Sequence, residues 1–237
     1  MEKTGTLYMI PCPIVDFQVG SIPSDTLDRT KKISHFVVER ARTARRWLSS
    51  IKHPVAIDDM SIYELDKNAP EQDLSQMLSH LQRGIDVGVL SEAGCPGIAD
   101  PGHRAVQYAH SKGYRVAPLV GPNSILMALM ASGFSGQSFA FHGYLPNKKP
   151  ELVRRLQTLE GQMIRSGQTQ LFMEAPYRNG FMIETACGVL QPRTLLSVAC
   201  DLDADTEYVR TFTVQDWKSI NVKPLHKRPA IFSIGKY

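Results

Sequence analysis

Residues 91–102, SEAGCPGIADPG, have the composition of a loop that holds a ligand. This stretch contains three glycines and two prolines, and it follows DVGVLS (86–91), an apolar run typical of a buried strand. Glycine lets the backbone approach a ligand closely or take a positive φ angle, and proline stiffens the loop. We therefore expect backbone N–H and C=O groups of this loop to bind a small polar ligand.

Three further segments combine proline with small or polar residues after a strand-like run. They are PCP (11–13), GPNS (121–124) and EAPYR (174–178). Any one of them alone is typical of a tight turn, but ligands in open α/β sheets bind at the carboxyl ends of strands. Four such segments together favour a ligand pocket. The chain has neither G-x-G-x-x-G, nor a P-loop, nor G-x-S-x-G, which argues against ordinary dinucleotide, nucleoside triphosphate and serine hydrolase sites.

The bulk composition is that of a globular protein with a mild positive charge. The 237 residues are 43% hydrophobic and 21% charged, with a net charge of +4. No window approaches a membrane span, and the first residues lack the features of a signal peptide, so we expect a cytoplasmic protein with no membrane partner. The four cysteines and seven histidines form no ligand spacing, and we expect no metal site.

Strand-like runs alternate with helical stretches along the whole chain. Strands are predicted over 6–10, 35–38, 55–57, 61–65, 86–91 and 114–120, and then over 138–146, 169–176, 194–202, 207–214 and 228–237. Helices are predicted over 24–33, 41–51, 70–83, 103–113, 125–133, 149–163 and 177–190. Asn68 followed by Glu71 resembles a capping box at the start of the third helix.

This order predicts an α/β protein with helices covering mostly parallel sheets. The glycine and proline of GPNS come between two such series of elements. We therefore divide the chain into an N-terminal α/β lobe, residues 1–120, and a C-terminal α/β lobe, residues 121–237.

The motifs, taken in order, are similar to those of a known family. TLYMIPCPI, VVERAR, GVLSEAGCPGIADPG, GPNS, FHGYLP and FMEAPYR resemble the tetrapyrrole methylase superfamily of S-adenosylmethionine (SAM) methyltransferases. Within it they are most similar to the branch of small-subunit rRNA 2′-O-methyltransferases. The resemblance implies two α/β lobes with SAM bound in the cleft between them, and a homodimer. It also implies the SAM contacts, at Pro11, Cys12, Pro13, Ser91, Glu92, Ala93, Gly94, Ile98, Ser124, Glu174, Ala175, Pro229 and Ala230.

Several segments depart from the pattern of the branch. P-I-G-N-L is replaced by PIVDF (13–17), E-D-T-R by ERAR (39–42), and E-L-T-K by DLDA (201–204). The segments on the SAM side are better kept than those expected to face the acceptor. We expect a SAM-dependent methyltransferase that acts on rRNA, at the ribose 2′-O by resemblance. A tetrapyrrole or other small anionic acceptor, or a SAM-binding paralogue without catalysis, stays open.

Methyl transfer to a hydroxyl benefits from a general base. Candidate catalytic residues are Glu39, Arg42 and Arg178. Glu92 could serve as a base or bind a hydroxyl or amine of SAM, and Glu39 could instead pair with Arg42. For two further acidic or basic groups a structural role is favoured, helix capping for Asp100 and burial in a strand for His142.

Two basic groups accompany the predicted loops. Arg40, Arg42, Arg45 and Arg46 gather at one helix start, and Lys148, Lys149, Arg154 and Arg155 follow the GYLP turn. They could bind RNA phosphates or tetrapyrrole carboxylates, or they could form solvated surfaces.

Overall fold

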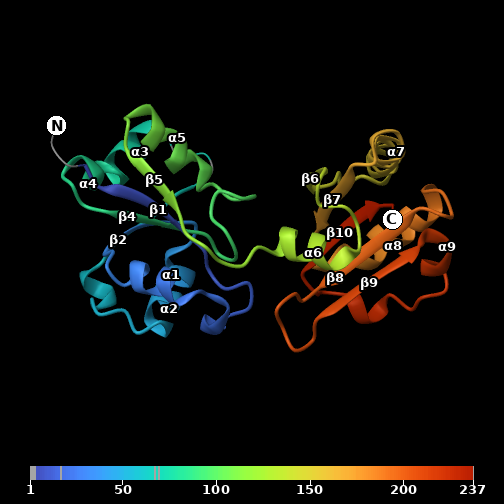
Figure 1. Ribbon diagram of the computed structural model, residues 1–237, viewed down its shortest axis with the longest axis horizontal. Coiled ribbons are helices and arrows are strands. Elements are labelled where there is room, and N and C mark those ends of the chain that lie inside the picture. Colours follow the sequence, from blue (N-terminus) through green and yellow to red (C-terminus); the bar gives the residue numbers. More distant parts are fainter. Residues whose placement is uncertain (1–3, 17, 67, 69, 237) are drawn as a thin grey trace. The chain divides into compact units, whose positions relative to one another are not determined.

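The computed structural model describes residues 4–16, 18–66, 68 and 70–236, and of Gln72 it describes the backbone alone. Its contacts divide the chain into unit 1, up to Asn123, and unit 2, from Ser124 (Figure 1). Each unit has its own five-stranded sheet and its own core. The fold class is therefore confirmed as two α/β lobes. Phe17 of the PIVDF segment and Tyr237 of the last predicted strand lie outside the described residues.

The sheet of unit 1 is parallel throughout. It contains β1 (Thr6–Ile10), β2 (His35–Val38), β3 (Ser61–Glu64), β4 (Val87–Leu90) and β5 (Arg115–Pro118), in the order β3-β2-β4-β1-β5. All five strands point the same way, so the loops that follow them emerge at one edge of the sheet. The predicted parallel sheet of the first half is confirmed.

Helices cover both faces of this sheet because β1 is apolar on both sides. Leu7 and Met9 enter one core, whereas Tyr8 and Ile10 enter the other. Figure 1 shows α1 (Ser24–Thr30) and α2 (Ala41–Ser50) on one face. On the other face it shows α3 (Glu71–Met77), α4 (Ser79–Gln82) and α5 (His103–Ser111).

Some secondary-structure predictions in unit 1 were wrong. Residues 55–57 do not form a strand, because a 3₁₀ helix begins there and spans Ile57–Asp59. The helix predicted over 70–83 is interrupted at Leu78, whose φ and ψ angles are −100° and 7°. Its N-cap is Pro70 rather than Asn68, whose own N–H donates to Asp66 Oδ1. The apolar period survives the interruption, since Leu78 and Leu81 are both fully buried.

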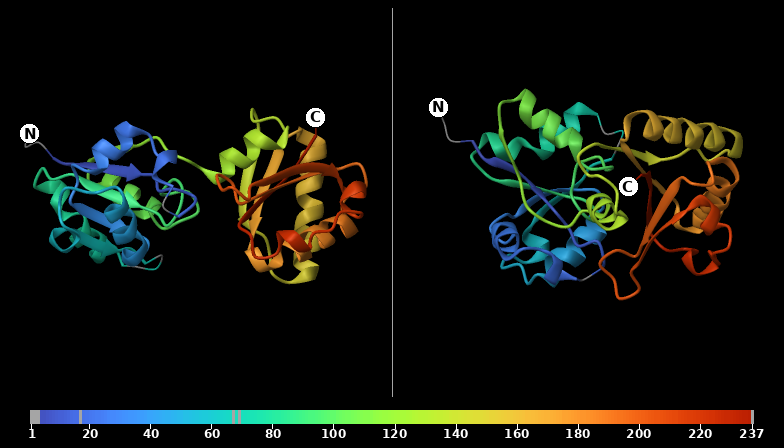
Figure 2. Two further views of the ribbon diagram at one scale, coloured as in Figure 1. Left: turned by 90° about the horizontal axis from the view of Figure 1, so that it is seen from below. Right: turned by 45° about the vertical axis from the view of Figure 1, so that its right-hand side comes forward.

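The sheet of unit 2 is mixed. It contains β6 (Phe139–Tyr144), β7 (Thr169–Glu174), β8 (Leu195–Cys200), β9 (Tyr208–Thr213) and β10 (Ala230–Gly235), in the order β6-β7-β10-β8-β9. Only β6 and β7 pair in parallel, and the other neighbours are antiparallel. Figure 2 shows the red strand β10 inside this sheet although it is the last element of the chain.

Successive residues of β7 and β10 face opposite sides of this sheet. Phe172 and Phe232 stack in a core that α7 (Lys149–Ser166), α8 (Asn179–Val189) and α9 (Val214–Trp217) complete. Leu171 and Ile231 face α6 (Ser124–Ser132) instead. No helix among the described residues is long and apolar enough to span a membrane.

Candidate functional site

The loops after β1 and β4 are joined by their backbones. The N–H of Cys12 donates to the carbonyl of Gly94 at 2.9 Å, and the N–H of Gly94 donates back at 3.0 Å. The buried hydroxyl of Ser91 donates to the Gly94 carbonyl at 3.0 Å and to that of Ala93 at 3.1 Å. Gly94 takes a φ of +70°, which glycine adopts without strain. The Cys12 and Gly94 amides therefore bind each other, and because the Gly94 carbonyl accepts two hydrogen bonds, a ligand would meet only the second lone pair of the Cys12 carbonyl.

Asp100 fixes the second half of the 91–102 loop. Its carboxylate accepts hydrogen bonds from the N–H of Gly97 at 2.9 Å and from the N–H of Gly102 at 2.6 Å. The N-cap of α5 is Gly102, so the predicted capping by Asp100 was wrong, although its role is structural. Burial raises the pKa of Asp100, and the two backbone donors oppose this rise.

The loop after β5 packs against the other two. A Cβ added at Gly121 would lie only 2.3 Å from Cβ of Pro11, so the two segments touch as closely as glycine allows. The thiol of Cys95 donates to the carbonyl of Pro122 at 3.4 Å. Three of the four predicted loops thus form one assembly at the carboxyl edge of the sheet in unit 1.

Among the residues that the structure describes, three hollows adjoin this assembly. A small one of about 30 Å³ is lined by four of the predicted SAM contacts, together with Thr43, Arg46 and Trp47. Those four contacts are Cys12, Pro13, Ser91 and Glu92. The indole Nε1 of Trp47 is buried there and has no hydrogen-bond partner among the described residues. A cavity of this size holds about one water molecule.

The second hollow is apolar and far larger, at about 580 Å³. Ile98, which is half exposed, lines it together with Cys95, Val116 and Leu119. His103, Gln107 and Asn123 add polar groups. This volume falls in the range of pockets that hold small molecules and cofactors.

The third hollow, about 590 Å³, brings Glu39 close to Asp100 and Arg40. Burial raises the pKa of the Glu39 carboxyl, and the charges of Glu92 and Asp100 add to this rise. Glu39 accepts the N–H of Glu92 at 3.3 Å, which works in the opposite direction. A carboxyl with a raised pKa that lines a hollow is a typical general base.

The ion pairs near this hollow differ from those expected. Among the residues that the structure describes, Glu39 does not pair with Arg42, which is exposed. Glu92 pairs instead with Arg40 at 3.4 Å and accepts a hydrogen bond from Thr43 at 3.3 Å. Arg46 lies 3.9 Å from Asp16.

In unit 2 four of the five predicted SAM contacts converge because β7 and β10 are antiparallel. Ala230 at the start of β10 pairs with Glu174 at the end of β7. The buried Glu174 accepts the N–H of Ala175 at 2.8 Å and forms an ion pair with Arg178 at 3.0 Å. Arg178 thus holds Glu174, which is a structural task. Ser124 is the first residue of α6, while Pro229 precedes β10 and is exposed.

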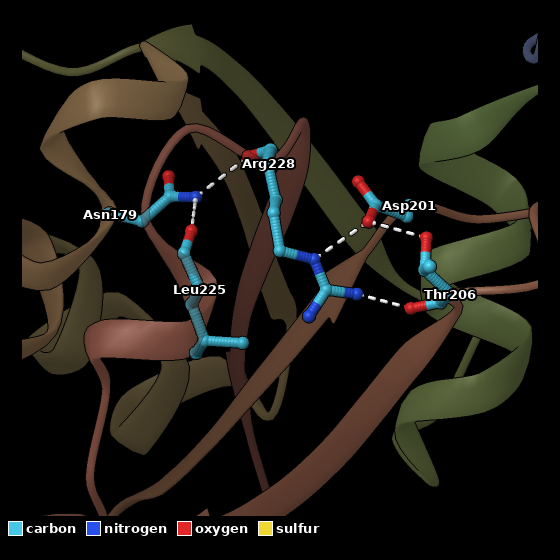
Figure 3. A network of polar contacts seen from close by, with 5 residues as sticks. All are labelled: Asn179, Asp201, Thr206, Leu225 and Arg228. Carbon is cyan, nitrogen blue, oxygen red and sulfur yellow. Dashed lines mark hydrogen bonds and ion pairs between the residues drawn. The ribbon is translucent and has the colours of Figure 1, made fainter.

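A polar network beside Pro229 escaped the sequence analysis. Figure 3 shows the Arg228 side chain bonded to both Asp201 and Thr206, with Nε of Arg228 2.7 Å from Asp201 Oδ2 and a further bond to the Thr206 carbonyl. Asn179 donates to the carbonyls of Arg228 and Leu225 at 2.7 and 2.9 Å. The altered DLDA segment, which contains Asp201, was the only signal for this network in the sequence.

The second basic group, which follows the GYLP turn, contains one arginine with a side-chain partner and three exposed residues. Arg155 donates to Nδ1 of His142 at 2.9 Å, and Nε2 of His142 bonds to Gln170 at 2.7 Å. His142 is therefore a partnered strand residue, as expected. Lys148, Lys149 and Arg154 are exposed. Among the described residues no group of three or more His, Cys, Asp and Glu is placed to hold a metal ion.

Comparison with known proteins gives sequence relatives that include methyltransferases of ribosomal RNA. The ribosomal RNA small subunit methyltransferase I of Vibrio cholerae is 30% identical over 172 residues, which are 73% of this chain and 56% of that protein. Its counterpart in Micromonospora olivasterospora is 31% identical over 204 residues, 86% of this chain and 61% of that protein. The chain thus matches a little more than half the length of these relatives. No protein-family model matches it.

Solved structures share the fold at low sequence identity. The structure of the methyltransferase CobJ superposes with a TM-score of 0.64 at 14% identity. The match covers 99% of this chain and 95% of CobJ. Uroporphyrin-III-C-methyltransferase from Thermus thermophilus gives a TM-score of 0.57 at 17% identity, with 98% and 92% of the two chains covered.

Proposed function

We propose that this chain, which belongs to the tetrapyrrole methylase superfamily, is a SAM-dependent methyltransferase that acts on ribosomal RNA. The observation that carries the proposal is the sequence similarity to rRNA small subunit methyltransferases I at 30 to 31% identity. The joined loops of unit 1 and the convergent strand ends of unit 2 agree with it. Because the match spans only part of those relatives, the activity of this chain needs its own test.

The residues around the loops of unit 1 fit SAM. The apolar hollow beside Ile98 has walls that suit an adenine ring or an aliphatic chain, and its polar groups suit hydroxyl, amino and carboxylate groups. SAM supplies an activated methyl group when bound, and the chain's own task is to orient donor and acceptor. We assign the SAM contacts in unit 1 to Pro11, Cys12, Pro13, Ser91, Glu92, Ala93, Gly94 and Ile98. In unit 2 we assign them to Ser124, Glu174, Ala175, Pro229 and Ala230.

For the acceptor we propose the ribose 2′-hydroxyl of rRNA, with Glu39 as the base that takes its proton. Glu39 lines a hollow, and its pKa is raised by burial. The exposed Arg42 and Arg45 on α2 follow it closely in sequence and supply positive charge for phosphates. Arg178 is assigned to holding Glu174 rather than to catalysis. An rRNA acceptor implies a cytoplasmic enzyme, and by resemblance we propose a homodimer.

A small anionic acceptor such as a tetrapyrrole is the second candidate. The observation that favours it is the shared fold with CobJ and uroporphyrin-III-C-methyltransferase. At 14 to 17% identity this likeness is weaker support than that from the sequence relatives. A SAM-binding protein without catalysis is the third candidate, and the changed ERAR and DLDA segments favour it.

Calorimetry with SAM, followed by RNA binding at several salt concentrations, tests the proposal. We expect SAM to bind, and we expect RNA affinity to fall steeply as salt rises, because each phosphate contact releases counterions. A tetrapyrrole held by one or two charges would respond less to salt. Absence of SAM binding in a folded sample would overturn the proposal.

A further inference from the structure

Two tyrosines of unit 2 are exposed at the carboxyl ends of neighbouring parallel strands. Tyr144 ends β6 and is 63% exposed, and Tyr177 follows β7 and is 64% exposed. Figure 1 shows β6 and β7 side by side, in agreement with their pairing. Aromatic rings exposed to this degree contribute little to the core and are accessible to a ligand.

A bulge in β6 sets the face on which Tyr144 lies. Phe141 pairs with Leu171, but Tyr144 pairs with Met173, so β6 has one residue more than β7 over this stretch. Gly143 takes a φ of +63° at the bulge. With the register of Phe141 continued unshifted, Tyr144 would pair with Glu174 and lie on the opposite face of the sheet. Bulges of this kind commonly re-aim a side chain beside a functional site.

Hydrogen bonds tie three chain segments together around the tyrosines. Arg178 donates to the carbonyl of Asn147 at 3.1 Å, which joins the turn after β7 to the turn after β6. The same guanidinium pairs with Glu174 and lies 4.7 Å over the ring of Phe181, so its position is fixed. The N–H of Lys227 donates to the carbonyl of Pro176 at 2.9 Å and brings in the segment before β10.

These segments also carry Lys148, Lys149 and Lys227, all of them exposed. In the part of the chain that the structure describes, no ion pair involves any of the three lysines. Of the nearby carboxylates, Glu174 is buried and paired with Arg178, whereas Glu151 in the first turn of α7 is exposed. The surface therefore combines two exposed rings with an excess of positive charge.

We infer that Tyr144, Lys148, Lys149, Tyr177 and Lys227, here named the basic-aromatic patch, bind the single-stranded RNA that flanks the methylated nucleotide. This inference rests on the proposed function. Exposed aromatic rings stack on bases of any sequence, and lysines contact the phosphates between them. RNA bases must be unstacked to be recognised in this way, so the patch selects single-stranded over duplex RNA.

The test uses the full-length chain and a fluorescent single-stranded RNA of about 12 nucleotides. We expect Tyr144→Ala and Tyr177→Ala each to weaken RNA binding about tenfold or more, whereas Tyr144→Phe and Tyr177→Phe keep most of it, because phenylalanine retains the ring. For single-stranded RNA, each phosphate contact contributes roughly 0.7 to the steepness with which log affinity falls against log salt concentration. Replacing Lys148, Lys149 and Lys227 together by Gln should therefore reduce this steepness by about 2. The matched control replaces the exposed Lys32, Lys218 and Lys236 by Gln, which removes the same charge outside the patch.

SAM calorimetry on every variant separates this inference from the proposed function. Unchanged SAM binding with weakened RNA binding supports the patch. Wild-type RNA affinity in both alanine variants overturns it while leaving the proposed function intact. A change of oligomeric state in those variants, measured by light scattering, also overturns it, because the tyrosines would then belong to an interface between copies. Loss of SAM binding in the wild-type protein instead contradicts the proposed function itself.

Discussion

The sheet of unit 1 is parallel throughout, whereas the sheet of unit 2 pairs only β6 and β7 in parallel. In unit 1 the loops after β1, β4 and β5 meet because all strands end at the same edge, and their backbones and small residues hold them together. In unit 2 the end of β7 meets the start of β10, and side chains such as Arg178 and Arg228 do the holding. The loops of unit 1 are therefore held together by close backbone contacts, whereas the strand ends of unit 2 are held together by ion pairs of largely buried side chains.

The largest expected effect is the loss of methyl transfer when the candidate base in unit 1 is replaced. If the base lies in unit 1, Glu39→Gln should lower the rate of methyl transfer about a hundredfold or more with SAM affinity unchanged. Because burial raises the pKa of Glu39, the wild-type rate should fall as pH drops through that raised value, since the protonated carboxyl cannot accept a proton. Rates measured against pH check both points.

Asp66→Asn is the matched control for this variant, since Asp66 lines the same hollow. Its rate should stay within a few-fold of the wild-type rate. A Glu39→Gln enzyme with a wild-type rate would remove Glu39 from the mechanism.

Gly121 tests the close contact between the loops after β5 and β1 in unit 1. Gly121→Ala places a Cβ 2.3 Å from that of Pro11, so the two loops must separate. We expect a loss of about 3 kcal/mol in the free energy of unfolding, at the upper end for overpacking, and weaker SAM binding. Gly188→Ala in α8 has open space around it and should be neutral or stabilising. Equal stability of the two variants in urea would show that the close contact is unimportant.

Buried charge in unit 2 is tested at Arg228. Arg228→Met leaves the carboxylate of Asp201, which is 16% exposed, without its cation. We expect a loss of about 2 kcal/mol in stability, less than for a fully buried pair. Weaker SAM binding should follow, because Arg228 adjoins the Pro229 segment. Arg210→Met, at an exposed position of β9, serves as the control and should change neither quantity. Matching thermal transitions in the two variants would contradict the structural role of Arg228.

The smallest expected effect concerns thiol reactivity. Burial raises the pKa of Cys12 to about 12 and that of Cys200 to about 11, so both thiols stay protonated and protected. Cys95 is only half-buried. Brief alkylation of the native protein followed by mass spectrometry should modify Cys95 before the other two. Early modification of Cys12 would mean that the bridge between Cys12 and Gly94 opens readily.

Much of the fold followed from local patterns in the sequence. The apolar runs of β1 and β4 and the 3.6-residue period of Leu74, Leu78 and Leu81 were enough to place those elements. The period did not show that the helix stops at Leu78, because a short interruption keeps the same side chains buried. The strand expected at 55–57 failed because three apolar residues carry too little information.

The candidate site could be predicted only in outline. Loop composition predicted the special backbone of the 91–102 loop, in which Gly94 takes a positive φ, because glycine and proline report backbone demands that are local. The partners of charged groups are not local, so Arg40 rather than Arg42 turned out to hold a glutamate. The Arg228 network escaped for the same reason, since Asp201 and Arg228 are far apart in the sequence and meet only through the pairing of β8 with β10.

The central claim is that this chain transfers a methyl group from SAM to ribosomal RNA. Its most direct test is incubation of the purified protein with labelled SAM and small ribosomal subunits from a strain that lacks the corresponding methyltransferase. We predict that label enters the small-subunit RNA at a ribose 2′-oxygen and that Glu39→Gln abolishes most of it. Absence of label in the RNA of these subunits, with a protein that binds SAM, would contradict the claim.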